Sequence, residues 1–381
     1  VRGARGGGGG GAMELLRGAE AVGLAALMSG VEAYFGYPIT PSSEIMEFMA
    51  SELGDPRFPR YRAFVQASSE VEAVNMLMGA GAAGHLAMTA TSGPGLSLMA
   101  EGISYAVGME VPFLIVDVNR GGPGLGNVEP EQSDYLFVTR SLGHGGSRAI
   151  VLAPQGVEEA MELVNRGFRL AFRHRIPVVI LTDAIVVHMR ETVEVPALEP
   201  VDAGDAAWAA RGRMGGSRHL LTSMYLEPHE MRAHKEALAA KWRSIESEVR
   251  YFECAMCEDA DTLMVAYGVA ARKARGALRK LRGEGRRVGL FRPVSLNPFP
   301  WEELEEASEG RRVVVVEMSE GQLHEEVSAR LGPKVESVAA PGGEIVEPEE
   351  VVRWRQRASR RYTLGSRAPT APAASTGSCS S

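Results

Sequence analysis

Four polar side chains stand where apolar runs of the sequence end, and their types suit a site that binds an anion or a cofactor. They are Thr40, Glu70, Ser92 and Arg120. Arg120 opens a glycine-rich loop, and its planar guanidinium suits a carboxylate or a phosphate. Glu70 is expected at the first position of a helix, where the helix dipole keeps it ionised. No cysteine or histidine nucleophile stands among the four, which favours a site that holds a cofactor.

Each of these features also has a structural explanation. Thr40 before Pro41 fits a helix N-cap with proline at the first helical position. Ser69 and Glu72 fit a capping box, so Glu72 is expected to be structural. Residues 92–95 open a helix whose free amides can hold an anion, which is a weak signal alone. Arg120 on its own could equally be an exposed arginine in an ordinary loop.

The segments that must position these side chains alternate between strand-like and helix-like patterns from residue 14 to about 190. The expected strands are residues 31–37, 63–67, 86–91, 111–118, 149–152 and 178–181. The expected helices are residues 19–28, 41–53, 70–83, 96–107 and 157–172. This alternation predicts an α/β fold, with a doubly wound parallel sheet covered by helices on both faces. Ligands bind such sheets at the carboxyl ends of the strands, so the four polar residues would share one edge.

A second α/β unit is expected to begin near residue 261. Its expected strands are residues 263–267, 288–291 and 312–317, and its expected helices are residues 270–281, 301–307 and 322–331. A long charged helix is expected over residues 227–250. We therefore expect a disordered extension (1–13), a first α/β domain (14–195), a connector with the long helix (196–258), a second α/β domain (259–360) and a disordered tail (361–381).

Composition and motif spacing exclude several classes of function. The 381 residues carry a formal net charge of −7, which gives a nucleic-acid role no electrostatic support. No apolar run reaches membrane-spanning length. The glycines at 122, 124 and 126 lack the dinucleotide-binding spacing, and no P-loop motif occurs.

The three cysteines are too few for a metal centre of their own. Cys254 and Cys257 form a Cys-x-x-Cys, but the remaining cysteine, Cys379, lies in a Ser/Pro/Ala/Thr-rich tail, and a zinc or iron–sulfur site needs four ligands. We expect two incidental thiols in a reducing compartment, and no metal on this chain.

Several motifs resemble one family, the alpha subunits of 2-oxoacid:ferredoxin oxidoreductases. They are Gly-Tyr-Pro-Ile-Thr-Pro (36–41), Gln-Ala-Ser-Ser-Glu (66–70), Met-Thr-Ala-Thr-Ser-Gly-Pro-Gly (88–95), Glu-Gly-Ile-Ser-Tyr (101–105), Arg-Gly-Gly-Pro-Gly-Leu-Gly-Asn (120–127) with Gln-Ser-Asp-Tyr (132–135), Gly-His-Gly (143–145), Val-Ala-Tyr-Gly (265–268), Arg-Pro (292–293) and Val-Glu-Met-Ser (316–319). The resemblance covers about residues 14 to 350. The 120–135 segment looks most like the branched-chain (2-oxoisovalerate) members, and the 2-oxoglutarate members are close relatives.

The resemblance implies a fold, a cofactor and partners. The first domain would bind the pyrimidine side of thiamine diphosphate, and the second would be similar to the transketolase C-terminal domain. The family oxidatively decarboxylates a 2-oxoacid, forms an acyl-CoA from coenzyme A and reduces ferredoxin. A beta subunit would carry the diphosphate and Mg²⁺ half of the site. Iron–sulfur clusters would lie on partner subunits, including possible gamma and delta ferredoxin-like subunits, in a cytoplasmic hetero-oligomer.

The resemblance also implies roles for individual residues. Glu70 would hydrogen-bond a ring nitrogen of the aminopyrimidine, Arg120 would pair with the substrate carboxylate, and Thr40 would hydrogen-bond the substrate. The residues implied to contact the cofactor are Glu70, Pro38, Ser92, Gly93 and Gly95. Relatives often carry an acid where this chain has Ser68, which puts in doubt a role for that position.

Three alternatives remain open at this point. The substrate could be 2-oxoglutarate rather than a branched-chain 2-oxoacid. The chain could be a non-catalytic pairing subunit that has kept the fold, although Glu70, Arg120 and Thr40 speak against this. It could also belong to a non-redox thiamine enzyme of transketolase type.

Overall fold

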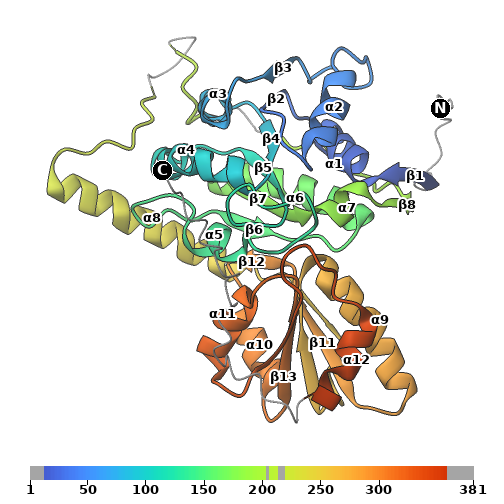
Figure 1. Cartoon of the computed structure of the whole chain (residues 1–381). Coiled ribbons are helices and arrows are strands. Elements are labelled where there is room, and N and C mark those ends of the chain that lie inside the picture. Colours follow the sequence, from blue (N-terminus) through green and yellow to red (C-terminus); the bar gives the residue numbers. More distant parts are fainter. Residues whose placement is uncertain (1–12, 203–205, 213–218, 358–381) are drawn as a thin grey trace, which may run out of the picture.

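Two large β-sheets stacked end to end form the body of the chain (Figure 1), and this computed structural model describes residues 13–202, 206–212 and 219–357. Residues 1–12 of the expected extension (1–13) and the whole expected tail (361–381) lie outside the described residues. Met13 belongs instead to strand β1 (Met13–Arg17), which pairs antiparallel with β8 (Arg190–Glu194). No helix in the described ranges combines the length and apolarity needed to cross a membrane.

The first sheet has seven strands, and its order places four expected ligand-binding strands side by side. The order is β12-β6-β7-β5-β4-β2-β3. The strands are β2 (Ala33–Gly36), β3 (Ala63–Gln66), β4 (Ala87–Thr91), β5 (Leu114–Asn119), β6 (Ile150–Leu152), β7 (Val178–Asp183) and β12 (Ser295–Asn297). All neighbours pair in parallel except β12, which runs antiparallel to β6. The carboxyl ends of β5, β4, β2 and β3 therefore meet at one edge.

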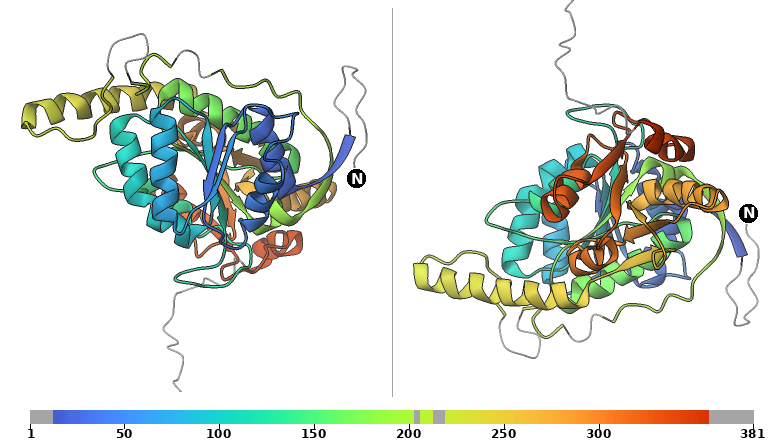
Figure 2. Two further views of the ribbon diagram at one scale, coloured as in Figure 1. Left: turned by 90° about the horizontal axis from the view of Figure 1, so that it is seen from above. Right: turned by 90° about the horizontal axis from the view of Figure 1, so that it is seen from below.

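Helices cover both faces of this sheet, as the view from above shows (Figure 2). One face carries α1 (Gly18–Met28), α2 (Ser43–Ser51), α6 (Val157–His174) and α7 (Ala184–His188). The other carries α3 (Glu70–Ala82), α4 (Gly93–Met109) and α5 (Tyr135–Arg140). Because both faces are covered, strands β4, β5 and β7 are buried along their whole length. The predicted α/β fold class is confirmed.

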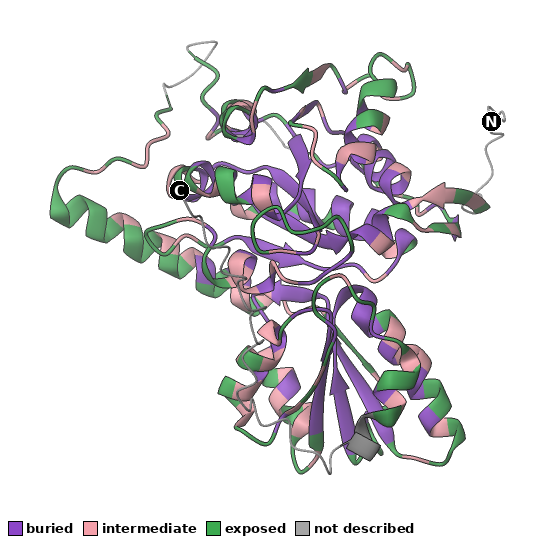
Figure 3. Cartoon of the chain, in the orientation of Figure 1, coloured by how far each residue is buried: buried purple, intermediate pink, exposed green. Residues whose placement is uncertain are grey.

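The second sheet has the order β14-β13-β10-β11-β9. Its strands are β9 (Phe252–Ala255), β10 (Thr262–Val265), β11 (Val288–Pro293), β13 (Arg312–Glu317) and β14 (Glu336–Ala339). Helices α9 (Gly268–Gly283) and α12 (Pro348–Arg357) pack together on one face, and α10 (Trp301–Ser308) and α11 (Gln322–Leu331) lie on the other. Helix α8 (Pro228–Glu248) projects from the body and is largely exposed (Figure 3).

The disulfide between Cys254 and Cys257 corrects the expectation of two incidental thiols. Strand β9 ends at Ala255, and Met256 then adopts a left-handed conformation (φ 55°), which turns the chain so that the two side chains meet.

On the same edge strand, Glu253 accepts a hydrogen bond from the buried Arg292. Arg292 also reaches Glu159 on α6 and so ties the second sheet to the first.

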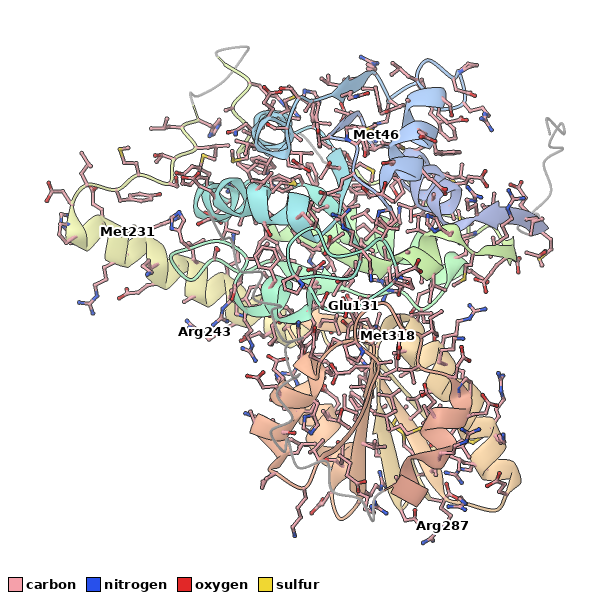
Figure 4. The ribbon with its side chains drawn as sticks, in the orientation of Figure 1. Met46, Glu131, Met231, Arg243, Arg287 and Met318 are labelled. Atoms are coloured by element: carbon pink, nitrogen blue, oxygen red, sulfur yellow. A yellow bond between two sulfur atoms is a disulfide. The ribbon has the colours of Figure 1, made fainter. Side chains whose placement is uncertain are left out.

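Gln132 makes the most concentrated contact between the two units. Its backbone N–H donates to Met318 O (2.7 Å), and its side-chain oxygen accepts from Met318 N–H (3.0 Å). Its side-chain amide donates to Tyr267 O (3.0 Å), and the Tyr267 hydroxyl donates to Gln132 O (3.3 Å). Met318 and the neighbouring Glu131 are labelled where the two units meet (Figure 4). All three hydrogen-bonded residues are buried, so water cannot replace these bonds.

We expect Gln132→Ala to destabilise the folded chain by about 2–4 kcal/mol, because each buried polar group left unpaired costs about 1–3 kcal/mol. The measurement is the free energy of unfolding from urea titration. Gln155→Ala is the matched control, since the side-chain oxygen of Gln155 has no hydrogen-bond partner among the described residues. Equal effects of the two substitutions would contradict a clamping role for Gln132.

Candidate active site

The candidate site lies at the carboxyl-end edge of the first sheet, where the loop after β5 borders a pocket of about 750 Å³. The pocket is lined by Gly93, Pro94 and Ser97 of α4, by residues 120–125, by Ser133, Asp134 and Phe137, and by Glu320 and Gln322 of the second unit. Arg120 and Gly93 therefore line this pocket as expected for a shared edge. Thr40, Glu70, Pro38, Ser92 and Gly95 do not line it.

Arg120 reaches across the sheet edge to the neighbouring strand end. Its Nη1 donates to Thr40 O (2.7 Å), and its Nη2 donates to Leu125 O (3.3 Å). Its Nε is buried and has no hydrogen-bond partner in the described part of the chain. The structure thus brings Arg120 and Thr40 together, but through the backbone carbonyl of Thr40 rather than its hydroxyl. A guanidinium has about five N–H donors, so Arg120 keeps donors that can bind an anion in the pocket.

The prediction that Thr40 caps a helix is wrong. Helix α2 begins at Ser43, and a tight turn over residues 39–42 precedes it. Ser42 closes this turn by donating from both its backbone N–H and its hydroxyl to Ile39 O. Thr40 is exposed and lies outside the helix, so its hydroxyl is not engaged in capping.

Glu70 opens α3, as predicted, and is 5% exposed. Ser69 caps the helix by accepting from Glu72 N–H, while Glu72 accepts from Ser68 N–H. No described residue donates a hydrogen bond to the Glu70 carboxylate. A Cβ at Gly95 would lie 2.5 Å from Glu70 Oε1 and 2.2 Å from Thr91 Oγ1. Any side chain larger than that of glycine would therefore clash with the Glu70 carboxylate. Glu70 is thus a buried acceptor held against the start of α4.

The start of α4 adds a second unpaired group. Ser92 is fully buried at the N-cap, and its hydroxyl neither caps the helix nor finds another partner among the described residues. A Cβ at Gly93 would lie 2.6 Å from Asp134 Oδ1, so Gly93 allows the acid of the following loop to approach the helix start. The expected contact residues Ser92, Gly93 and Gly95 therefore stand between Glu70 and Asp134, and Pro38 is half-buried at the end of β2.

Three acids behind the Arg120 loop were not among the expected site residues. Glu131 is fully buried and accepts from Gly122 N–H (3.0 Å) and Gly342 N–H (2.6 Å), which fixes the loop to the second unit. Asp134 N–H donates to Asn119 Oδ1 (2.9 Å), directly before Arg120. Burial, and then the charge of Asp134, raises the pKa of Asp117 well above its usual range. Asp134 belongs to the Gln-Ser-Asp-Tyr motif (132–135), which indicated the family but did not predict a role for this residue.

The Asp117–Asp134 pair makes stability depend on pH. Burial, and then Glu131, raises the pKa of Asp134 to about 6 from 3.8. Through Asp134 the folded chain binds more protons than the unfolded chain between about pH 4 and pH 6, so stability falls as the pH rises through this range. We expect Asp117→Asn to reduce the loss of unfolding free energy as the pH rises above about 4, because the neutral amide has no proton to give up.

The control for this prediction is Glu325→Gln, which removes an exposed carboxylate on α11. It should leave the pH profile of the unfolding free energy unchanged. An unaltered profile for Asp117→Asn would mean that Asp117 does not contribute to the pH dependence of stability.

No cluster of His, Cys, Asp or Glu that could hold a metal ion occurs in the described ranges. His144 does not belong to the candidate site, because it is exposed beside a different pocket of about 660 Å³ that residues of α4 and α8 also line.

Comparison with known proteins identifies the family. Residues 24–253 match the "Pyruvate flavodoxin/ferredoxin oxidoreductase, thiamine diP-bdg" model, and residues 260–351 match "Pyruvate:ferredoxin oxidoreductase core domain II". Ketoisovalerate oxidoreductase subunit VorB of Methanothermobacter thermautotrophicus is 44% identical over 345 residues, covering 90% of this chain and 96% of its own.

Solved structures agree with this assignment. 2-Oxoglutarate:ferredoxin oxidoreductase from Magnetococcus marinus superposes with a TM-score of 0.81 at 27% identity, over 91% of this chain, and this match spans 65% of that longer chain. A split-gene transketolase shares the fold at a TM-score of 0.55 and 18% identity, over 90% of this chain and 98% of its own. The chain therefore belongs to the 2-oxoacid:ferredoxin oxidoreductases, as one subunit with the thiamine-diphosphate-binding, transketolase-like fold.

Proposed function

We propose that the chain is the alpha subunit of an enzyme that oxidatively decarboxylates a branched-chain 2-oxoacid such as 2-oxoisovalerate. The products would be CO₂ and the acyl-CoA, with ferredoxin reduced. The observation that carries this proposal is the pairing of two features at one sheet edge: the Arg120 pocket and the buried Glu70 carboxylate, which has no partner among the described residues. A cofactor-binding acid and a carboxylate-binding cation are the two groups that such a reaction needs from this chain.

The residues around Glu70 fit the aminopyrimidine of thiamine diphosphate. Glu70 offers a buried acceptor, and Ser92 offers a buried hydroxyl without a partner among the described residues. Buried polar groups are normally hydrogen-bonded, so this pair is suited to a heterocycle with ring nitrogens and an amino group. When bound, the cofactor supplies the nucleophilic thiazolium carbon that attacks a keto group. Glu70 would hold a proton at a ring nitrogen and so favour the tautomer that activates that carbon.

The pocket beside Arg120 suits a substrate with one carboxylate and an apolar chain. Arg120 is the one cation among its lining residues, and the described lining also carries the acids Asp134 and Glu320. A 2-oxoglutarate molecule would bring a second carboxylate, which meets acids there rather than a second cation. Leu125 and Phe137 line the pocket and offer apolar contacts to a branched chain. This charge balance favours the branched-chain substrate, and VorB, the 44% identical relative, is named for ketoisovalerate.

The surface around Glu70 supports a partner subunit. Val65, Val71 and Leu98 lie on β3, α3 and α4 near the site and are 37%, 48% and 54% exposed. Exposed apolar side chains beside a cofactor site are typical of a protein interface. We infer that a beta subunit covers it and brings the diphosphate-and-Mg²⁺ half of the site. Iron–sulfur clusters would then reside on partner chains, with gamma and delta subunits as further candidates.

The function is tested on the complex obtained by co-expression with the beta subunit. 2-Oxoisovalerate, 2-oxoglutarate and pyruvate are compared as substrates, with coenzyme A present and viologen reduction as the readout. We expect the highest kcat/KM with 2-oxoisovalerate. Preference for 2-oxoglutarate would replace the branched-chain proposal, and absence of viologen reduction with any 2-oxoacid would favour a non-redox or non-catalytic role.

We expect Glu70→Gln to lower kcat by about 10²–10⁴-fold, the range typical of a lost general acid–base group. The same complex should keep its substrate KM, because Glu70 lies outside the pocket that Arg120 lines. Glu72→Gln is the matched control, since Glu72 is exposed on the same helical turn and its side chain accepts from Ser68 alone among the described residues. Full activity in Glu70→Gln would remove Glu70 from the catalytic assignment.

We expect Arg120→Ala to raise the KM for 2-oxoisovalerate by about 10–100-fold, because a charge-assisted hydrogen bond is worth about 1.5–3 kcal/mol. The shift in melting temperature caused by thiamine diphosphate should persist in this variant. Arg62→Ala, which removes a distant exposed arginine, serves as the control. An unchanged KM in Arg120→Ala would show that the substrate carboxylate binds elsewhere.

A further inference from the structure

The Cys254–Cys257 disulfide lies apart from the Arg120 pocket, at the free edge of the second sheet. Strand β9 is the last strand of that sheet and, within the described part of the chain, pairs with β11 alone. Cys254 is exposed on this edge, whereas Cys257 is 7% exposed and packs in the core. One sulfur of the pair is therefore open to attack from solvent, and the other is shielded.

The turn that carries the two cysteines is held by contacts other than the disulfide. Arg282 donates to Met256 O (2.6 Å) and to Val288 O (2.6 Å), and it pairs with Asp259. Gly289 permits a close approach, because a Cβ there would lie 2.9 Å from Met256 O and 3.0 Å from the Cα of Cys257. These contacts fix the turn on β11 whether or not the sulfurs are bonded.

The buried sulfur has acceptors in place for a thiol hydrogen. Cys257 Sγ lies 3.6 Å from Leu290 O and 3.8 Å from Ala255 O, both within sulfur hydrogen-bond distance. A free Cys257 thiol could therefore donate to a backbone carbonyl without any rearrangement of the strand. The turn therefore offers the Cys257 thiol of the dithiol form a hydrogen-bond acceptor.

The disulfide is also poorly suited to a stabilising role. The cysteines are separated by three positions, so their bond closes a very short loop. Because the stabilisation from a cross-link grows with the number of residues it encloses, this one constrains the unfolded chain little. An exposed, short-range disulfide that adds little stability has the properties of a reducible pair.

We propose that Cys254 and Cys257 form a reversible thiol–disulfide exchange site for a dithiol partner, with Cys254 as the sulfur that is attacked. A thiolate of the dithiol bonds to Cys254 Sγ, the Cys254–Cys257 bond breaks, and Cys257 leaves as a thiolate that takes up a proton. The second thiol of the partner then displaces Cys254 and closes the partner's own disulfide. Two electrons and two protons pass to the chain, and the dithiol is oxidised. This site does not depend on the function proposed above.

The test uses the full-length chain, equilibrated with mixtures of reduced and oxidised dithiothreitol without denaturant. Free thiols are then trapped with iodoacetamide and assigned by peptide mass spectrometry, which separates Cys379 from the pair. We expect Cys254 and Cys257 to open together in a single two-electron transition that oxidised dithiothreitol reverses. The circular dichroism spectrum should be the same in both states, because Arg282 holds the turn in each.

Two single variants test the assigned order of attack. In Cys257→Ser, Cys254 should be alkylated about tenfold or more faster than Cys257 is in Cys254→Ser, since the latter thiol is buried. A pair that opens only in denaturant, or whose reduction unfolds the chain, would instead be a structural staple and would overturn the proposal. Equal alkylation rates, or a pair that remains as free thiols under oxidised dithiothreitol, would overturn it as well.

Discussion

The hydrogen bonds of Gln132 join the carboxyl-end edge of the first sheet to the second unit, and the site depends on that junction. Gln132 exchanges four bonds with Tyr267 and Met318, at the ends of β10 and β13. The residues on either side of it, Glu131 and Ser133, hold the Arg120 loop from behind: Glu131 accepts from Gly122 N–H, and the Ser133 carbonyl accepts from Gln322. A loop of glycines has no side chains with which to fix its own shape. The second unit therefore provides the rigidity that the first unit's loop lacks.

The buried acids around this loop account for much of its electrostatics. Asp117, Asp134 and Glu131 surround the base of the loop, and the Arg120 charge lowers the pKa of Asp134 in opposition to burial. A cation that faces only buried acids would be neutralised by them. Because the pKa of Asp117 is raised, that acid tends to hold a proton, which leaves less negative charge to compete with a substrate for Arg120. The protonation of a residue outside the pocket thus bears on the strength of the anion site within it.

Much of the sheet and part of the site could be predicted from the sequence, because these features follow from local patterns. Apolar runs identified β4, β5 and β7, and Ser69 with Glu72 correctly put Glu70 at the start of α3. The pairing of β1 with β8, and the place of β12 in the first sheet, escaped prediction because their partners lie more than 140 residues away. The structural role of Gln132 was missed for the same reason, since Tyr267 and Met318 are 135 and 186 positions distant. Thr40 was misassigned because Thr-Pro fits both a helix cap and a turn, and only the bonds of Ser42 to Ile39 distinguish them.

Strand β12 has a consequence for how this chain can be divided. Residues 295–297 leave the second unit and cover the outer edge of β6, where Ala153 N–H donates to Val294 O and Asn297 donates to Ala149 O. A fragment that ended at the connector would contain every helix of the first sheet and still leave β6 as an open edge. Open edges recruit strands from other molecules, so such a fragment would be prone to self-association. Gene fission or a truncated expression product would therefore have to keep residues 294–297 with the first sheet, although they follow β11 in the chain.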